Sequence, residues 1–184
     1  MDNGASSYRR FLEGDKNGLS EIVRMYADGL ILYINSFVHD VHTAEDLTED
    51  VFAKLIAKKP AYSGRSSFKT WLYTIARNIA LDHVKHKKLK NESSIDDMYD
   101  IADKTDIEKR YIKSEDMALL YRLIEKLAPD YRLVLLMVYI EGFDNDEASH
   151  LMNKSKRQTE NLLYRAKQAL KKEYEKEGIS YEEL

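Results

Sequence analysis

Residues 67–88 read SFKTWLYTIARNIALDHVKHKK, and they combine features that a helix filling a core does not need. The chain's single Trp lies near the start of this stretch, an Asn lies in its middle, and cations gather at its end. On a 3.6-residue period one side carries Leu72, Ile75, Ala76 and Ile79. The other side carries Thr74, Arg77, Asn78, Leu81 and Lys85. We therefore predict one helix with a buried face and a second face that serves another purpose.

The composition of the whole chain favours helices. Its 184 residues include two prolines and seven glycines, which leaves room for long helices and few tight turns. Strict alternation of apolar and polar residues, the pattern of half-buried strands, is missing. We expect an all-α protein with one domain of ordinary size or two small ones.

Cysteine content and hydropathy exclude several classes of protein. Without cysteine there are no disulfides and no thiolate metal sites. No apolar run approaches the roughly 20 residues needed to cross a bilayer, and residues 1–15 lack the apolar core of a signal peptide. We expect a cytoplasmic protein without membrane insertion.

The charges of the chain form blocks. The formal net charge of −3 argues weakly against a nucleic-acid-binding protein. Residues 65–90, however, carry seven cations against one acid, and residues 153–176 carry eight cations against three acids. Residues 91–108 carry seven acids against one lysine. Because partners dock locally, these blocks matter more than the net charge.

The N-terminal half reads as a series of helices. Residues 6–37 are helical in pattern, with Gly14 and Gly18 separating a first helix from a second. Thr43 begins a Thr-x-x-Asp capping-box pattern that starts the next helix, which ends before Pro60. The expected core face of that helix consists of Leu47, Val51, Phe52, Leu55 and Ile56. The opposite face carries Asp46, Glu49, Asp50 and Ala53.

The acidic residues 89–113 lose helical periodicity and read as a linker. We therefore expect two small helical domains at residues 1–88 and 114–177, with a tail at residues 178–184.

The second domain has the layout of a helix-turn-helix. Residues 116–127 form one amphipathic helix, and Pro129 suits the first turn of the next, which Gly142 can end. The patterns at 144–147 and 155–158 each begin with a capping residue. They predict a short helix, a tight turn and a long basic helix.

Cations and flat aromatic faces are interleaved in residues 62–88, and single-stranded DNA requires both for its phosphates and bases. The aromatics are Tyr62, Phe68, Trp71 and Tyr73, and the cations include Arg65, Lys69, Arg77 and Lys85. Ser63 and Gly64 belong to a loop at 60–67 whose backbone could wrap an extruded base. The alternative is that the rings pack into the core and the cations are solvated.

The last basic helix suits duplex DNA, because a helix in the major groove needs donors near its N-terminus. The candidates are Lys154, Ser155, Lys156, Arg157, Gln158, Asn161 and Arg165. A solvated charged face is the alternative. The spacing of Asp46, Glu49 and Asp50 gives one acidic patch, which is either solvated or a docking site for a basic partner helix.

The sequence carries no sign of catalysis. The five histidines lack a Glu-x-x-His or His-Glu-x-x-His pattern, so we expect no metal site. A phosphate-binding glycine loop and a serine nucleophile elbow are missing too. We expect neither an enzyme nor a cofactor.

Three motifs together resemble the extracytoplasmic-function (ECF) sigma factors of bacterial RNA polymerase. They are AEDLTEDVF at 44–52, SSFKTWLYTIARNIALDHVKHKK at 66–88, and LAPDYRLVLLMVYIEG at 127–142 before the helix-turn-helix. The resemblance covers roughly residues 8–88 and 115–175. The second domain departs from the family in part: Glu160 would repel phosphate, and Asn145, Ala148 and Ser149 replace residues typical of the preceding helix.

The resemblance implies a role for each site. The clamp of the largest polymerase subunit would be bound by Asp46, Glu49 and Asp50. The second domain would bind the flap of the second-largest subunit. The loop at 62–67, with Phe68 and Lys69, would capture a flipped base of the −10 element. Trp71, Thr74, Arg77 and Asn78 would face the opening promoter DNA, with Lys85 in the cationic tail. Residues 154–165 would read the −35 element.

The resemblance also implies that the acidic linker lies in the RNA exit path of the polymerase. Family members are commonly held inactive by an anti-sigma factor, so such a partner is possible here as well. Two other interpretations are a stand-alone helix-turn-helix regulator and a helical protein-interaction module. The acidic patch separates the first of these from a sigma factor, because a free regulator has no need for it.

Overall fold

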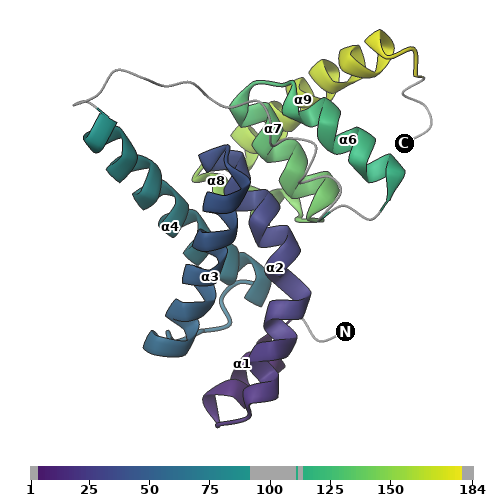
Figure 1. Ribbon diagram of the computed structural model, residues 1–184. Helices are drawn as coiled ribbons and strands as arrows, with labels where there is room; N and C mark the ends of the chain where they lie inside the picture. Colours follow the sequence, from purple (N-terminus) through teal and green to yellow (C-terminus); the bar gives the residue numbers. More distant parts are fainter. Residues whose placement is uncertain (1–3, 92–110, 112–113, 180–184) are drawn as a thin grey trace. The chain divides into compact units, whose positions relative to one another are not determined.

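A computed structural model describes residues 4–91, 111 and 114–179 (Figure 1). Every regular element in these residues is helical, which confirms the predicted all-α class. The chain divides into two compact units, whose described parts are residues 4–91 and residues 111 and 114–179. The predicted acidic linker lies largely outside the described residues.

Within its described residues, 4–91, the N-terminal unit contains four helices. They are α1 (Ala5–Leu12), α2 (Lys16–Val38), α3 (Val41–Lys58) and α4 (Phe68–Asn91). Helix α2 packs against the other three and so forms the centre of the unit (Figure 1). Helix α4 continues past residue 88, where the sequence predicted the first domain to end.

The two glycines between α1 and α2 have different roles. Gly14 lies in the turn with a φ of 105°, a left-handed conformation that favours glycine. Gly18 is buried inside α2, so the prediction that it separates the helices was wrong. A Cβ at residue 18 would lie 2.2 Å from the backbone oxygen of Ser7, so Gly18 lets α1 cross closely over α2.

Helix α3 begins earlier than predicted, because Asp40 rather than Thr43 is its N-cap. The Asp40 carboxylate accepts a 2.7 Å hydrogen bond from the backbone N–H of Thr43. Thr43 is therefore the third helical residue, and Val41 joins the core. The helix ends at Lys58, and the next residue, Lys59, is its C-cap with a left-handed φ of 43°, directly before Pro60.

The core of this unit differs in detail from the predicted stripes. Leu47, Val51, Phe52 and Leu55 of α3 are buried as expected. Ile56 is 50% exposed, so its assignment to the core was wrong. On α4 the fully buried positions are Phe68, Leu72, Tyr73, Ala76 and Ala80, while Ile75 and Ile79 are half-buried. The buried stripe of α4 thus follows an i, i+4 row.

In residues 114–179 the C-terminal unit forms α6 (Glu115–Glu125), α7 (Pro129–Leu135), a π-helical turn η2 (Leu136–Ile140), α8 (Asn145–Met152) and α9 (Lys156–Lys176). Helix α9 packs against α6, α7 and α8. The sequence predicted one regular helix from Pro129 to Gly142, and the structure inserts the π turn in it. There the backbone N–H of Glu141 donates to the carbonyl of Leu136 over 2.9 Å.

Both predicted capping boxes of the helix-turn-helix are present. Asp144 caps α8 with Glu147 as its reciprocal partner, and Ser155 caps α9 with Gln158. The turn between the helices passes through Asn153, whose φ of 53° is left-handed.

Among the helices of the described residues, none has the length and apolar character needed to span a membrane.

Candidate nucleic-acid interface

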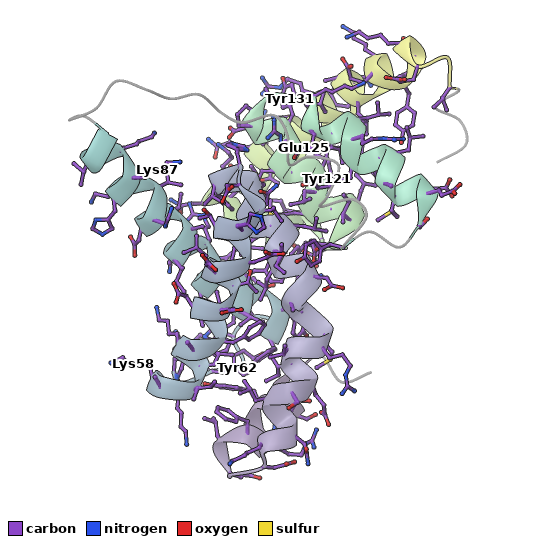
Figure 2. All side chains as sticks on the ribbon, in the orientation of Figure 1. Lys58, Tyr62, Lys87, Tyr121, Glu125 and Tyr131 are labelled. Carbon is purple, nitrogen blue, oxygen red and sulfur yellow. The ribbon has the colours of Figure 1, made fainter. Side chains whose placement is uncertain are left out.

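An aromatic cluster joins α1, the loop at 60–67 and the start of α4. The ring of Trp71 lies 5.2 Å from Tyr8, 5.3 Å from Tyr62 and 5.3 Å from Phe68, measured between centroids. Tyr8 and Phe68 are buried, whereas Tyr62 and Trp71 are only partly covered. Figure 2 marks the position of Tyr62 in the N-terminal unit. The cluster therefore has a buried base and a partly open rim formed by Tyr62 and Trp71.

The burial of Phe68 corrects one assignment from the sequence. Its side chain is 0% exposed, so the ring cannot stack on a base, and it belongs to the core instead. Tyr73 is buried as well, beneath the ammonium of Lys69, whose Nζ lies 5.4 Å from the ring centroid. For these two aromatics the alternative interpretation, packing in the core, is correct.

The loop at 60–67 is fastened at both ends. At its start, the hydroxyl of Tyr8 donates a 2.7 Å hydrogen bond to the carbonyl of Pro60. At its end, the hydroxyl of Tyr62 donates a 2.6 Å hydrogen bond to the carbonyl of Ser66. Gly64 lies between these points with a φ of 73°, and the space around its Cα is open. The loop is therefore held in shape while its tip remains accessible.

A pocket of about 290 Å³ opens between this loop and α1. Its lining consists of Ala5, Tyr8, Arg9 and Leu12 from α1, and of Tyr62, Ser63 and Gly64 from the loop. The sequence analysis identified the three loop residues but not the α1 residues. No local pattern links residue 8 with residue 60, because their contact depends on how α1 folds back over α2.

The outer face of α4 carries the other predicted residues. Asn78 and Lys85 are exposed, and Arg65 is exposed in the loop before the helix. Thr74 is half-buried, and its hydroxyl donates a 2.8 Å hydrogen bond to the carbonyl of Thr70. Arg77 is half-buried too. Thr74, Arg77, Asn78 and Lys85 thus form a partly exposed polar row along α4.

Arg77 also acts on a buried group beneath it. Burial raises the pKa of the Tyr33 hydroxyl, and the positive charge of Arg77 opposes that rise. The guanidinium of Arg77 therefore lies within electrostatic range of the core, although part of its side chain reaches solvent.

The acidic patch lies on the exposed face of α3, as predicted. Asp46, Glu49 and Asp50 are all exposed, and the half-exposed Ile56 lies further along the helix. The three carboxylates form no ion pair with residues 4–91 or 114–179. Their charge is consequently available to a partner.

On the helix-turn-helix, several predicted DNA-reading residues are engaged within the protein. Ser155 Oγ accepts from the backbone N–H of Gln158, and Gln158 Oε1 accepts from the backbone N–H of Ser155, at 3.3 and 2.8 Å. Lys154 forms an ion pair with Asp130 at 3.3 Å. The side chains of these three residues thus stabilise the turn.

Lys156 is paired as well. Its Nζ lies 2.9 Å from the carboxylate of Asp146, and this hydrogen bond raises the pKa of Lys156. Arg157, Asn161 and Arg165 are exposed on α9. They form the face that remains open to a duplex.

The structure adds one residue to this face of α9. Tyr164 is 65% exposed and follows Asn161 by three positions, so the two side chains share a side of the helix. The sequence analysis missed it, although its helical spacing from Arg157 and Asn161 could have revealed it. Glu160 is exposed near the same face and adds a negative charge there.

Comparison with known proteins places these two units in one family. Sigma-70 region 2 matches residues 22–90, and Sigma-70, region 4 matches residues 117–170. The ECF RNA polymerase sigma factor SigM of Bacillus subtilis is 32% identical over 165 residues, which cover 89% of this chain and 99% of that relative. The chain belongs to the ECF RNA polymerase sigma factors. The sigma factor directs promoter recognition in transcription initiation.

Other relatives agree with this assignment. The ECF sigma factor SigW of Bacillus subtilis is 26% identical to the sigma factor over 170 residues, covering 88% of this chain and 91% of the relative. Sigma factor RpoE of Bartonella quintana, solved in complex with the anti-sigma factor NepR, shares the fold with a TM-score of 0.69 at 20% identity. That match covers 85% of this chain and 96% of RpoE.

The two matched regions cover most of the candidate sites, with one exception. The loop at 60–67, the outer face of α4 and the acidic patch fall within the region 2 match, and the helix-turn-helix falls within the region 4 match. Helix α1 precedes the region 2 match. One wall of the pocket in this sigma factor thus lies outside the matched region.

Proposed function

We propose that the N-terminal unit opens the −10 element and holds one unpaired base in the pocket between α1 and the loop at 60–67. The pocket, next to the partly exposed rings of Tyr62 and Trp71, is the observation that carries this proposal. Its volume lies near the lower end of the range for small-molecule sites, which suits a single base. Ser63 and Gly64 line the pocket from the loop side and would contact that base.

The proposed mechanism is melting by capture. Extruding a base costs a few kcal/mol, and stacking one base on an aromatic ring contributes about 1–3 kcal/mol. Capture of one or two bases on Tyr62 and Trp71 is therefore of the size needed to hold a short open segment. Arg65, Arg77 and Lys85 would bind the phosphates around it. The protein uses binding energy here and breaks no covalent bond, so it is not an enzyme.

The acidic patch of α3 has a different proposed partner. Its three exposed carboxylates, Asp46, Glu49 and Asp50, suit a basic surface of core RNA polymerase, which we assign to the clamp of the largest subunit. A free DNA-binding regulator would have no use for such a patch. This feature favours the sigma-factor mechanism over the stand-alone helix-turn-helix regulator.

The C-terminal unit is proposed to read the −35 element through Arg157, Asn161 and Arg165 of α9. At the same time it would bind the flap of the second-largest polymerase subunit. In this proposal the ion pairs of Lys154 and Lys156 hold the turn in place.

The relatives RpoE and CnrH have been solved in complex with NepR and with the cytosolic domain of CnrY, respectively. We propose on that basis that an anti-sigma factor regulates this protein in the cytoplasm.

In vitro transcription tests the proposal. Core polymerase with the purified chain is expected to start transcripts that core alone does not, and sequencing those transcripts gives the promoters. Asn78→Ala should reduce permanganate reactivity of unpaired thymines in the −10 element and leave binding to core unchanged. A lack of new transcripts would refute the proposal, and unchanged reactivity would remove Asn78 from the site.

A further inference from the structure

We propose that α1 is the specificity-determining wall of the base pocket, and that Arg9 selects the captured base by donating two hydrogen bonds to it. This inference rests on the proposed function, since it requires a base in the pocket. It adds a residue and a selection rule for that base.

The polar groups around the pocket point to Arg9. Of the two tyrosines in the lining, Tyr8 donates its hydroxyl proton to the carbonyl of Pro60, and Tyr62 donates its own to the carbonyl of Ser66. Ala5, Leu12 and Gly64 have no polar side chain. The side chains of the lining that can still donate a hydrogen bond are therefore those of Arg9 and Ser63.

Arg9 also differs from its neighbour Arg10. The guanidinium of Arg10 pairs with Asp15 at 3.0 Å and with Glu21, and so fastens α1 to α2. Arg9 is exposed, and its guanidinium forms no hydrogen bond or ion pair within the described part of the chain. The two adjacent arginines consequently have separate roles, one structural and one available to a ligand.

The position of Arg9 is fixed even though its side chain is exposed. The preceding residue, Tyr8, is 1% exposed, packs against Phe68 and Trp71, and is tied to Pro60. Helix α1 is thereby held against the loop that forms the opposite wall. A side chain on such a fixed backbone can discriminate between ligands, because only the side chain, and not the backbone, has to be ordered when the ligand binds.

The chemistry of guanidinium gives the selection rule. It is a planar fork of donors with no acceptor, and it binds two adjacent acceptors best. Guanine offers such a pair in O6 and N7, and unpaired cytosine offers O2 and N3. In adenine the N6 amino donor lies beside both N1 and N7, and in thymine the N3–H donor separates the two carbonyls. Arg9 should therefore favour guanine or cytosine at the captured position.

Selection from a pool of random single-stranded oligonucleotides, using core polymerase bound to the full chain, tests this rule. The wild-type protein should enrich guanine or cytosine at one position, by roughly 5- to 150-fold over adenine and thymine. Arg9→Ala and Arg9→Lys should both lose most of that preference and keep the preferences at all other positions, because lysine retains the charge but lacks the fork. Arg24→Ala, which removes an exposed arginine of α2 outside the pocket, should behave as wild type.

Two outcomes would overturn the role of Arg9 and leave the proposed function standing. One is that Arg9→Ala retains every base preference of the wild type. The other is that it weakens binding by the same factor for all four bases, which would identify a phosphate contact. If the wild-type complex captures no strand and starts no transcript, the proposed function fails and this inference fails with it. Thermal unfolding of each variant, followed by the fluorescence of the single Trp, should match that of the wild type.

Discussion

The Tyr8 hydroxyl donates a 2.7 Å hydrogen bond to the carbonyl of Pro60, across 52 positions of sequence. This bond joins the first helix of the chain to the start of the loop that forms the pocket. The ring of Tyr8 also lies 5.2 Å from Trp71, between centroids. The fluorescence of this single Trp should therefore report on the region directly.

Tyr8→Phe tests how strongly this bond holds the pocket together. The phenyl ring preserves the packing, but the Pro60 carbonyl loses its partner, so the free energy of unfolding of the N-terminal unit should fall by about 1 kcal/mol. Urea unfolding followed by Trp71 fluorescence measures it. Tyr164→Phe, which removes an exposed hydroxyl in the other unit, should leave the Trp71 transition unchanged. An unchanged transition in Tyr8→Phe would mean that the bond contributes nothing to stability.

The N-cap of α3 should make stability depend on pH. Hydrogen bonding from Thr43 lowers the pKa of Asp40, so the folded state favours the charged carboxylate. The stability from this cap is then fully present above the pKa of Asp in the unfolded chain, about 3.9, and is lost as the pH falls through the lower folded value.

Two substitutions separate the cap from its charge. Asp40→Ala should reduce the free energy of unfolding at pH 7 by about 1 kcal/mol, because the Thr43 N–H loses its acceptor. Asp40→Asn should keep most of that stability, since Asn is also a good N-cap, and should show a smaller loss below about pH 4. Urea unfolding at several pH values distinguishes them. Equal acid sensitivity in Asp40→Asn and wild type would assign the effect to other groups.

Charge reversal on the acidic patch should weaken binding to core RNA polymerase. Asp50→Lys removes an attractive charge and adds a repulsive one at an exposed position, so we expect a loss of about tenfold at low salt, equivalent to about 1.4 kcal/mol. The loss should shrink as the salt concentration rises, because exposed charges are screened. Fluorescence anisotropy with labelled protein measures both effects. Asp28→Lys, an identical change on the exposed face of α2, serves as the control, and an equal loss there would argue against a specific patch.

The features that the sequence predicted well are local ones. The capping boxes at Asp144 and Ser155 each involve residues three positions apart, so they form without contacts from the rest of the fold. The pocket, in contrast, depends on contacts between residues that are far apart in the sequence. Its α1 wall depends on Gly18, where the missing Cβ allows α1 to cross close to α2, and the sequence pattern suggested a helix break at that residue.

Errors in the predicted core have a related cause. Periodicity gives the direction of a buried face, but the neighbouring helices decide its width and exact centre. Ile56 follows the apolar pattern of α3 and is still half-exposed, whereas Phe68 was assigned to DNA and is fully buried. An aromatic residue beside cations fits both a core and a base-stacking surface, and only the packing of Tyr8 and Tyr62 around Phe68 decides between them.

The ion pair between Lys156 and Asp146 gives a prediction for the helix-turn-helix. Lys156 is the first residue of α9, and its Nζ lies 2.9 Å from the Asp146 carboxylate. Asp146→Asn would release this cation toward phosphate and remove one negative charge from the DNA-facing end. The affinity of the holoenzyme for promoter duplex should therefore rise, and the slope of log K against log salt should become steeper by about 1. Asp116→Asn removes the same charge from α6 and should change neither quantity. If the slope for Asp146→Asn equals that of the wild type, Lys156 does not reach phosphate, and the duplex contacts of α9 reduce to its exposed arginines and Asn161.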